Sequence, residues 1–124
     1  MIPTSSSQKL RGYGCMATLF PMVYILASQR NGTLYIGVTS DLIGRISLHK
    51  QNLLPGFTSR YGVHRLIYFE ELGTMIEAIA REKQLKKWPR ARKISLIENF
   101  NPDWREMYYE VSGLADPDKI ERPF

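Results

Sequence analysis

An Asn31-Gly32 pair between two runs of β-branched and aromatic residues constrains the fold more than any other feature of the chain. Both residue types tolerate a positive φ, so this dipeptide between apolar runs is the strongest short signal for a β-hairpin. The flanking runs cover residues 23–27 and 33–38. The sequence therefore predicts two antiparallel strands joined by a two-residue loop.

The expected loop length also predicts which residues share a face of the sheet. A two-residue loop pairs Leu26 with Gly37 and Tyr24 with Thr39. Directly opposed residues project to the same side, and the side alternates along each strand. Tyr24 and Tyr35 are therefore expected on one face, several residue pairs apart, whereas a three-residue loop would place them on opposite faces.

One further strand and three helices are expected after the hairpin. The polar residues 39–41 can cap a helix that runs to about Gln51, and Thr74 with Glu77 forms a capping box for a helix that runs to about Trp88. Pro89 ends that helix and suits the first turn of the next one. The remaining elements are a strand at 66–69 and a helix at about 90–100, which residues 101–103 end.

The 124 residues fit a single domain. The pattern divides them into a flexible extension at 1–21, a domain at 22–107 and a C-terminal tail at 108–124. A single cysteine, Cys15, excludes an internal disulfide framework and a cysteine-rich zinc site, and it fits a reducing, cytoplasmic compartment. No run of about 18 apolar residues occurs, so no membrane span is expected.

The net charge of +5 is concentrated in one segment. Residues 81–93 hold seven basic side chains and one acidic one, while residues 103–124 are net acidic. A basic helix is a common solvated surface as well as a common contact for a polyanion, so charge alone leaves nucleic-acid binding open.

Glu82 is the most informative single position, because it falls beside an apolar stripe of its predicted helix. The stripe consists of Met75, Ala78, Ile79 and Leu85. An unpaired carboxylate facing the interior would be expensive, so a cation partner or a bound metal ion would explain it. The alternatives are a flanking position with the carboxylate in water and an internal salt bridge.

Arg45 and His49 lie one turn apart on the first predicted helix. Arg45 can stabilise charge on a phosphate, and His49 can relay a proton or position a water. The simpler interpretation of this pair is a surface Arg beside a partly buried His. For Tyr24 and Tyr35 the simpler interpretation is that each packs as an ordinary strand residue. A tyrosine becomes a base only where cations lower its pKa, which Arg45, His49 and a cation at Glu82 are expected to do.

These residues together resemble the GIY-YIG nuclease superfamily. The two triplets are Met22-Val23-Tyr24 and Tyr35-Ile36-Gly37, with Arg45 and His49 following and Glu82 on the later helix. The resemblance covers about residues 22–107 and is closest to small stand-alone bacterial members, which are related to the nuclease domain of a DNA-repair excinuclease. It implies a compact α/β (α+β) fold, with a three-stranded, mostly antiparallel sheet and packed helices.

The resemblance also implies an activity, the Mg²⁺- or Mn²⁺-assisted hydrolysis of phosphodiester bonds in DNA with one divalent ion. By position, Glu82 matches the metal-binding glutamate and Arg45 the arginine that stabilises the phosphate. Tyr24 matches the proposed base or water-orienting tyrosine, with Tyr35 and His49 assisting. Asn101 is a weaker match to a late asparagine whose spacing varies. DNA repair is among the pathways in which such an enzyme acts.

The expected substrate is DNA, including single-stranded or branched DNA, held by its backbone. No membrane partner and no small-molecule cofactor are expected, and the oligomeric state is open, with a monomer compatible. A nucleic-acid-binding module with little activity and a protein that binds an acidic protein surface remain as alternatives. The residues expected to contact DNA are Arg60, Lys83, Lys86, Lys87, Arg90, Arg92 and Lys93.

Overall fold

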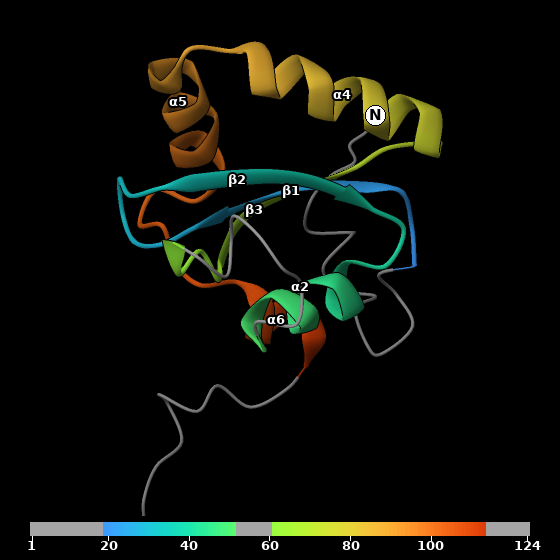
Figure 1. Cartoon of the computed structure of the whole chain (residues 1–124), viewed down its shortest axis with the longest axis horizontal. Coiled ribbons are helices and arrows are strands. Elements are labelled where there is room, and N and C mark those ends of the chain that lie inside the picture. Colours follow the sequence, from blue (N-terminus) through green and yellow to red (C-terminus); the bar gives the residue numbers. More distant parts are fainter. Residues whose placement is uncertain (1–18, 52–60, 114–124) are drawn as a thin grey trace, which may run out of the picture.

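The computed structural model describes residues 19–51 and 61–113, which form a three-stranded sheet between two layers of helices (Figure 1). The expected α+β fold with an antiparallel sheet is confirmed. None of the helices in these two ranges is long and apolar enough to cross a membrane. In chain order the elements are β1 (Met22–Ala27), β2 (Leu34–Thr39), α2 (Leu42–Lys50), β3 (Arg65–Glu71), α4 (Met75–Lys87), α5 (Arg90–Phe100) and α6 (Tyr108–Ser112).

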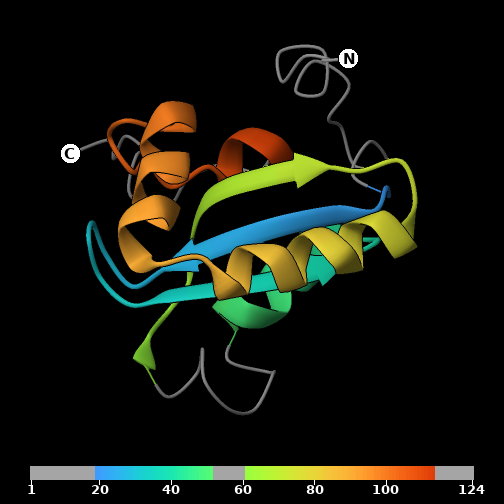
Figure 2. The same cartoon turned by 90° about the horizontal axis from the view of Figure 1, so that it is seen from above.

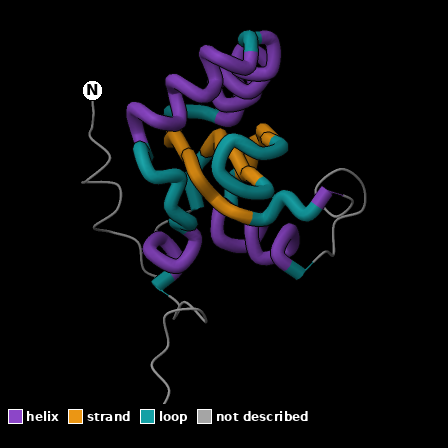
Figure 3. Tube along the Cα trace, turned by 90° about the vertical axis from the view of Figure 1, so that its left-hand side faces the viewer, coloured by secondary structure: helices purple, strands orange, loops and turns teal. Residues whose placement is uncertain are grey.

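The strand order β2-β1-β3 places β1 in the centre, with an antiparallel neighbour on each side. All six residues of β1 are buried, since helices cover both faces of the sheet. Helices α2 and α6 lie on one face, and α4 and α5 lie on the other (Figures 1 and 3). Even-numbered residues of β1 pack toward α2 and odd-numbered residues toward α4, so each face has its own core.

The hairpin forms where expected, but its register differs by two residues from the prediction. Tyr24 pairs with Gly37 and Leu26 with Tyr35, and Ser28 N–H donates to the Thr33 carbonyl at 3.0 Å. The loop therefore has four residues, 29–32, in place of two. Four is also an even number, so the prediction that Tyr24 and Tyr35 share a face is confirmed.

Contacts of the loop explain why the longer turn forms. Asn31 takes a positive φ of 58°, and the Gly32 N–H donates to the Gln29 carbonyl at 2.9 Å. The Ser28 Oγ accepts from the Thr33 N–H at 3.0 Å. Arg90 of α5 then donates to the carbonyls of Asn31 and Gly32, both at 2.7 Å. Asn-Gly thus marks the turn, while side chains outside the pair determine its length.

The helices begin and end close to their predicted positions. The Asp41 carboxylate caps α2 by accepting from the Gly44 N–H at 3.1 Å. The capping box of Thr74 and Glu77 at the start of α4 is present in both directions. Pro89 lies at the N-cap of α5, which Asn101 ends. These local signals suffice because each cap depends on residues only three or four positions apart.

The packed part of the chain extends past the expected domain boundary at residue 107. Tyr108 and Val111 of α6, which lies beside α2 on the same face of the sheet (Figures 1 and 3), are buried in the core, although a tail was expected from residue 108. The Glu106 carboxylate ties this segment down by accepting from the Leu66 N–H at 2.8 Å and by pairing with Lys50 at the end of α2. Of the expected extension and tail, residues 1–18 and 114–124 lie outside the described residues.

Candidate active site

Tyr24, Tyr35 and His49 form one aromatic cluster between the hairpin and α2. The ring centroids are 6.2 Å apart for the two tyrosines, 5.8 Å for Tyr24 and His49, and 5.3 Å for Tyr35 and His49. The Tyr24 hydroxyl lies 3.0 Å from His49 Nε2. The register brings the tyrosines together, because the residue paired with Tyr24 is only two positions from Tyr35.

Gly37 gives the Tyr24 ring its place across the neighbouring strand. A Cβ at position 37 would lie 2.9 Å from Tyr24 Cε1, and still closer to Cζ and the hydroxyl oxygen. Such approaches are far shorter than normal carbon contacts of about 3.5–4.0 Å. The glycine of the Tyr35-Ile36-Gly37 triplet is thus required by a close approach of a side chain, since its φ is not positive.

Burial controls the protonation of this cluster. Burial raises the pKa of Tyr24 above its ordinary value, Tyr35 raises it further, and the Arg45 charge only partly opposes them. Burial also lowers the pKa of His49 to about 4, assisted by the charges of Arg45 and His64. Arg45 does lower the pKa of Tyr24 as expected, but desolvation outweighs it in the chain alone. The expected contribution of a cation at Glu82 stays a prediction. Near pH 7 Tyr24 is protonated, and its hydroxyl shares a hydrogen bond with Nε2 of the neutral His49.

Arg45 is exposed one turn before His49 and makes no salt bridge with a carboxylate among the residues described. Its charge influences the pKa of both Tyr24 and His49, so the guanidinium borders the cluster from the solvent side. His64 is half-buried. Its Nδ1 is the one buried side-chain polar atom without a hydrogen-bond partner in the described ranges. His64 comes directly before β3 and influences the pKa of His49, but no motif spacing in the sequence links the two histidines.

Glu82 reaches the site from α4, on the opposite face of the sheet. The buried positions of α4 are Ala78 and Leu85, with Glu82 between them and its side chain 15% exposed. Met75 and Ile79 are exposed, so the expected apolar stripe is narrower than predicted. In Figure 2, α4 runs lengthwise over β1 and β2 and contacts both strands, and in this position only the narrower stripe is buried.

The Glu82 carboxylate has a cation partner within its own helix. Lys86 Nζ lies 3.1 Å from Glu82 Oε2, and the Lys86 side chain is 53% exposed. The internal salt bridge left open by the sequence is thus present. The negative charge of Glu82 also contributes to the raised pKa of Tyr24, after burial and Tyr35. Lys86 and Tyr35 further line one cavity of about 340 Å³, which links the α4 side of the site to the hairpin.

The donor set around Glu82 fits a magnesium ion held by few protein ligands. In the described ranges no group of three or more His, Cys, Asp or Glu side chains could enclose a metal ion. Mg²⁺ commonly keeps several waters and uses one or two carboxylates together with substrate phosphates. A single hard carboxylate oxygen beside a predicted phosphate site matches this preference, whereas it matches zinc poorly.

The predicted DNA-contacting residues divide into two groups. Arg90 holds the hairpin loop, and the Arg92 guanidinium stacks 3.9 Å from the centroid of the Trp88 ring. Lys83, Lys87 and Lys93 form no salt bridge with a described carboxylate. The sequence shows the positive charge of this segment but not which side chains the fold already uses. Arg60 lies outside the described residues.

Asn101 is buried on the β3 side of the sheet and is fully engaged there. Its amide nitrogen donates to the carbonyls of Ile67 at 3.1 Å and Arg105 at 2.9 Å, and its oxygen accepts from the Arg105 N–H at 3.0 Å. None of these bonds involves the aromatic cluster. The structure therefore gives Asn101 a structural place and does not bring it to the candidate site.

Comparison with known proteins gives a consistent result. A family model described as the GIY-YIG catalytic domain matches residues 20–95. A UPF0213 protein of Clostridium perfringens is 36% identical over 77 residues, which cover 62% of this chain and 82% of that protein. A UPF0213 protein of Oceanobacillus iheyensis is 33% identical over 76 residues, which cover 61% of this chain and 87% of that protein. The solution NMR structure of a UPF0213 protein from Bacillus halodurans is 25% identical, covers 74% of this chain and 97% of its own, and has a TM-score of 0.45.

Proposed function

Because the chain belongs to the family of the GIY-YIG catalytic domain, we propose that it is a metal-dependent endonuclease that hydrolyses phosphodiester bonds in DNA with low sequence specificity. The observation that best supports this proposal is the hydrogen-bonded Tyr24–His49 pair beside Tyr35 and Arg45. Packing alone does not require the neutral imidazole of His49 on α2 to bond the buried phenol of Tyr24 on β1.

In this mechanism the proton of the attacking water passes through the aromatic cluster. Tyr35 is less buried than Tyr24 and is therefore the tyrosine nearer to the substrate. The two tyrosines are hydrogen-bonded, and Tyr24 is bonded to His49. Tyr35 accepts the proton from water as it passes its own proton to Tyr24, and Tyr24 passes its proton to His49 Nε2. His49 is neutral at pH 7, since its pKa is about 4, so it holds the proton only transiently and releases it to solvent. The bond from phosphorus to the leaving oxygen breaks as the water adds, and that oxygen takes up a proton from solvent.

Arg45 and Glu82 supply the charges that the phosphate requires. The exposed Arg45 guanidinium stabilises the negative charge that develops on the phosphate oxygens. Glu82 would hold a divalent ion, which supplies Lewis-acid stabilisation of a phosphoryl oxygen and lowers the pKa of a bound water. Lys86 pairs with Glu82, and its side chain is 53% exposed, so its ammonium keeps donor hydrogens for the substrate backbone.

The test is metal-dependent cleavage by Glu82→Gln beside Glu77→Gln. Glu77 lies on the same helix, undergoes the same chemical change, and retains its capping box because Gln also serves at that position. With plasmid or single-stranded DNA and Mg²⁺ or Mn²⁺, we expect Glu82→Gln to lose about a hundredfold or more in rate and Glu77→Gln to stay near wild type. DNA binding by Glu82→Gln should be retained. Equal rates for both variants, or no cleavage by any of the three proteins, would refute the proposal.

A catalytically weak nucleic-acid-binding module is the second candidate. It is favoured by the burial of Tyr24, which is 1% exposed, and by its raised pKa, since both make this hydroxyl a poor base. Metal-independent DNA binding that weakens steeply with salt, without nicking under any condition tested, would establish this function instead.

A further inference from the structure

The cavity at the open edge of β2 has the composition of a site for an anion with an apolar body. Its volume is about 340 Å³, within the range of small-molecule sites. Two lysines from different helices line it, Lys86 of α4 and Lys93 of α5, and no carboxylate is part of its lining. The rest of the lining belongs to β2, namely Leu34, Tyr35 and Ile36.

The backbone of β2 adds hydrogen-bonding groups to this cavity. β2 is an edge strand, and Ser28 donates to the directly opposed Thr33, so this pair is a hydrogen-bonded one. Hydrogen-bonded and non-hydrogen-bonded pairs alternate along an antiparallel ladder. Leu34 and Ile36 therefore belong to non-hydrogen-bonded pairs, and their N–H and C=O groups point to the open edge. Backbone N–H groups are common partners of phosphate oxygens.

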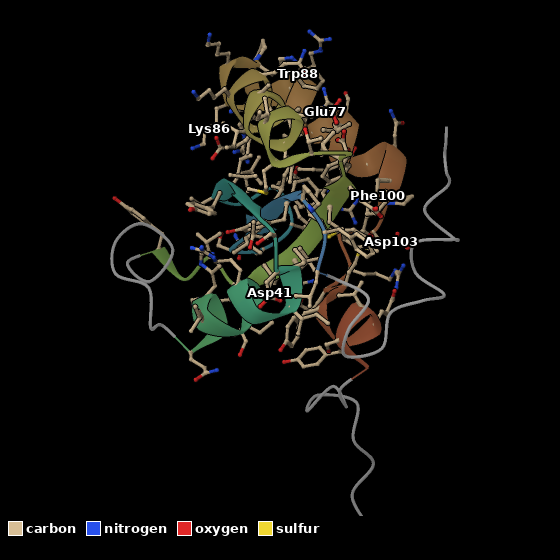
Figure 4. All side chains as sticks on the ribbon, turned by 90° about the vertical axis from the view of Figure 1, so that its right-hand side faces the viewer. Asp41, Glu77, Lys86, Trp88, Phe100 and Asp103 are labelled. Carbon is tan, nitrogen blue, oxygen red and sulfur yellow. The ribbon has the colours of Figure 1, made fainter. Side chains whose placement is uncertain are left out.

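The two lysines reach the cavity from the helix layer above the sheet. Figure 4 shows Lys86 on the side of α4 that lies over β2, away from α5. Lys93 is half-buried and forms no salt bridge with a described carboxylate, so its charge is available to a ligand. Half-burial also strengthens its attraction for an anion relative to a fully solvated lysine.

We propose that this cavity binds one nucleotide unit of the substrate strand, with its phosphate between Lys86 and Lys93 and its sugar and base against Leu34 and Ile36. The proposal rests on the proposed function, because Tyr35 lines both this cavity and the aromatic cluster. A strand whose reacting phosphate lies at Tyr35 places its neighbouring nucleotide at this edge. The positive lining favours a nucleotide over a peptide strand added to β2.

The test is a titration of the full chain, without metal, with deoxyadenosine monophosphate, deoxyadenosine and inorganic phosphate, followed by amide NMR. We expect the monophosphate to shift the amides of Leu34, Tyr35 and Ile36 and to bind more tightly than either part alone. Lys93→Gln should weaken this binding by about tenfold, the loss of one charge-assisted hydrogen bond. The matched control is Arg30→Gln, which also removes one positive charge at an exposed position, in the hairpin loop outside the cavity, and should stay within about twofold of wild type.

Absence of shifts at residues 34–36, or equal weakening by Lys93→Gln and Arg30→Gln, would overturn the proposal. Equal affinity for inorganic phosphate and the monophosphate would also overturn it, because the apolar wall would then contribute nothing. No DNA cleavage is needed for the readout. Nucleotide binding without nuclease activity would support this site and refute the proposed function. Cleavage without nucleotide binding would support the proposed function and refute this site.

Discussion

Replacing Gly37 with alanine tests whether the close approach of Tyr24 to β2 positions the candidate site. The added Cβ would lie 2.9 Å from Tyr24 Cε1 and closer still to Cζ and the hydroxyl oxygen. Tyr24 is 1% exposed, and its hydroxyl is 3.0 Å from His49 Nε2. If the Tyr24 ring moves away from position 37, the core around it must repack and its hydrogen bond to His49 must lengthen.

Two opposing effects determine the size of the change. Overpacking a core by one carbon typically destabilises it by about 1–3 kcal/mol. Alanine is otherwise better than glycine inside a strand by about 0.5–1 kcal/mol. Gly37→Ala should therefore lower the free energy of unfolding by about 1–2 kcal/mol. In a Tyr24→Leu background, which has no atoms at the Cζ and hydroxyl positions, the same change should be neutral or stabilising.

Urea unfolding of the four proteins of this double-mutant cycle measures the coupling energy, expected at about 1–3 kcal/mol. The NMR titration of His49 gives a second readout in the folded state. Displacement of Tyr24 lets water reach the imidazole, so the pKa of His49 should rise from about 4 toward its ordinary value in Gly37→Ala. An equal effect of Gly37→Ala in both backgrounds, with an unchanged His49 titration, would refute the steric explanation.

Three further outcomes are expected. His49 is protonated below about pH 6.5 in the unfolded chain but only near pH 4 in the folded chain. As the pH falls from 6.5 to 4, the free energy of unfolding should therefore decrease by up to about 3 kcal/mol. Urea midpoints from pH 7 to 4 should show this loss in wild type and not in His49→Gln. Asn101→Ala removes the side-chain partner of three backbone groups, one buried at Ile67 and two part-buried at Arg105, and should cost about 2–3 kcal/mol. A melting temperature within about 2 °C of wild type would contradict this. Arg90→Ala should cost only about 0.5–1 kcal/mol and should speed amide exchange at residues 29–32, because its two bonds hold an exposed loop; unchanged exchange would show that the loop holds itself.

The elements were predictable because their signals are local. The caps at Asp41 and Thr74 depend on side chains that bond backbone groups three residues away. The break at Pro89 follows from the proline ring itself, and the Asn101 N–H that ends α5 bonds a carbonyl four residues earlier. The common face of Tyr24 and Tyr35 followed from the even parity of the loop, which survived a change of its length from two residues to four.

The charges of the site were less predictable because they depend on burial and on distant partners. A tyrosine beside an arginine can have a lowered or a raised pKa. The burial of Tyr24 outweighs the charge of Arg45, and burial cannot be read from the sequence. The basic segment likewise shows seven positive charges, yet its sequence does not show that Arg90 holds a loop 58 residues away.

The sequence by itself determined the hairpin, the helix boundaries and the family, because backbone propensity, capping and motif spacing are encoded within short windows. The tertiary structure alone decided the register, the direction of the Tyr24 and His49 pKa shifts, the position of Glu82 on the opposite face, and the packing of α6 beside α2. Each of these depends on desolvation or on contacts between residues far apart in the chain, which no local pattern records.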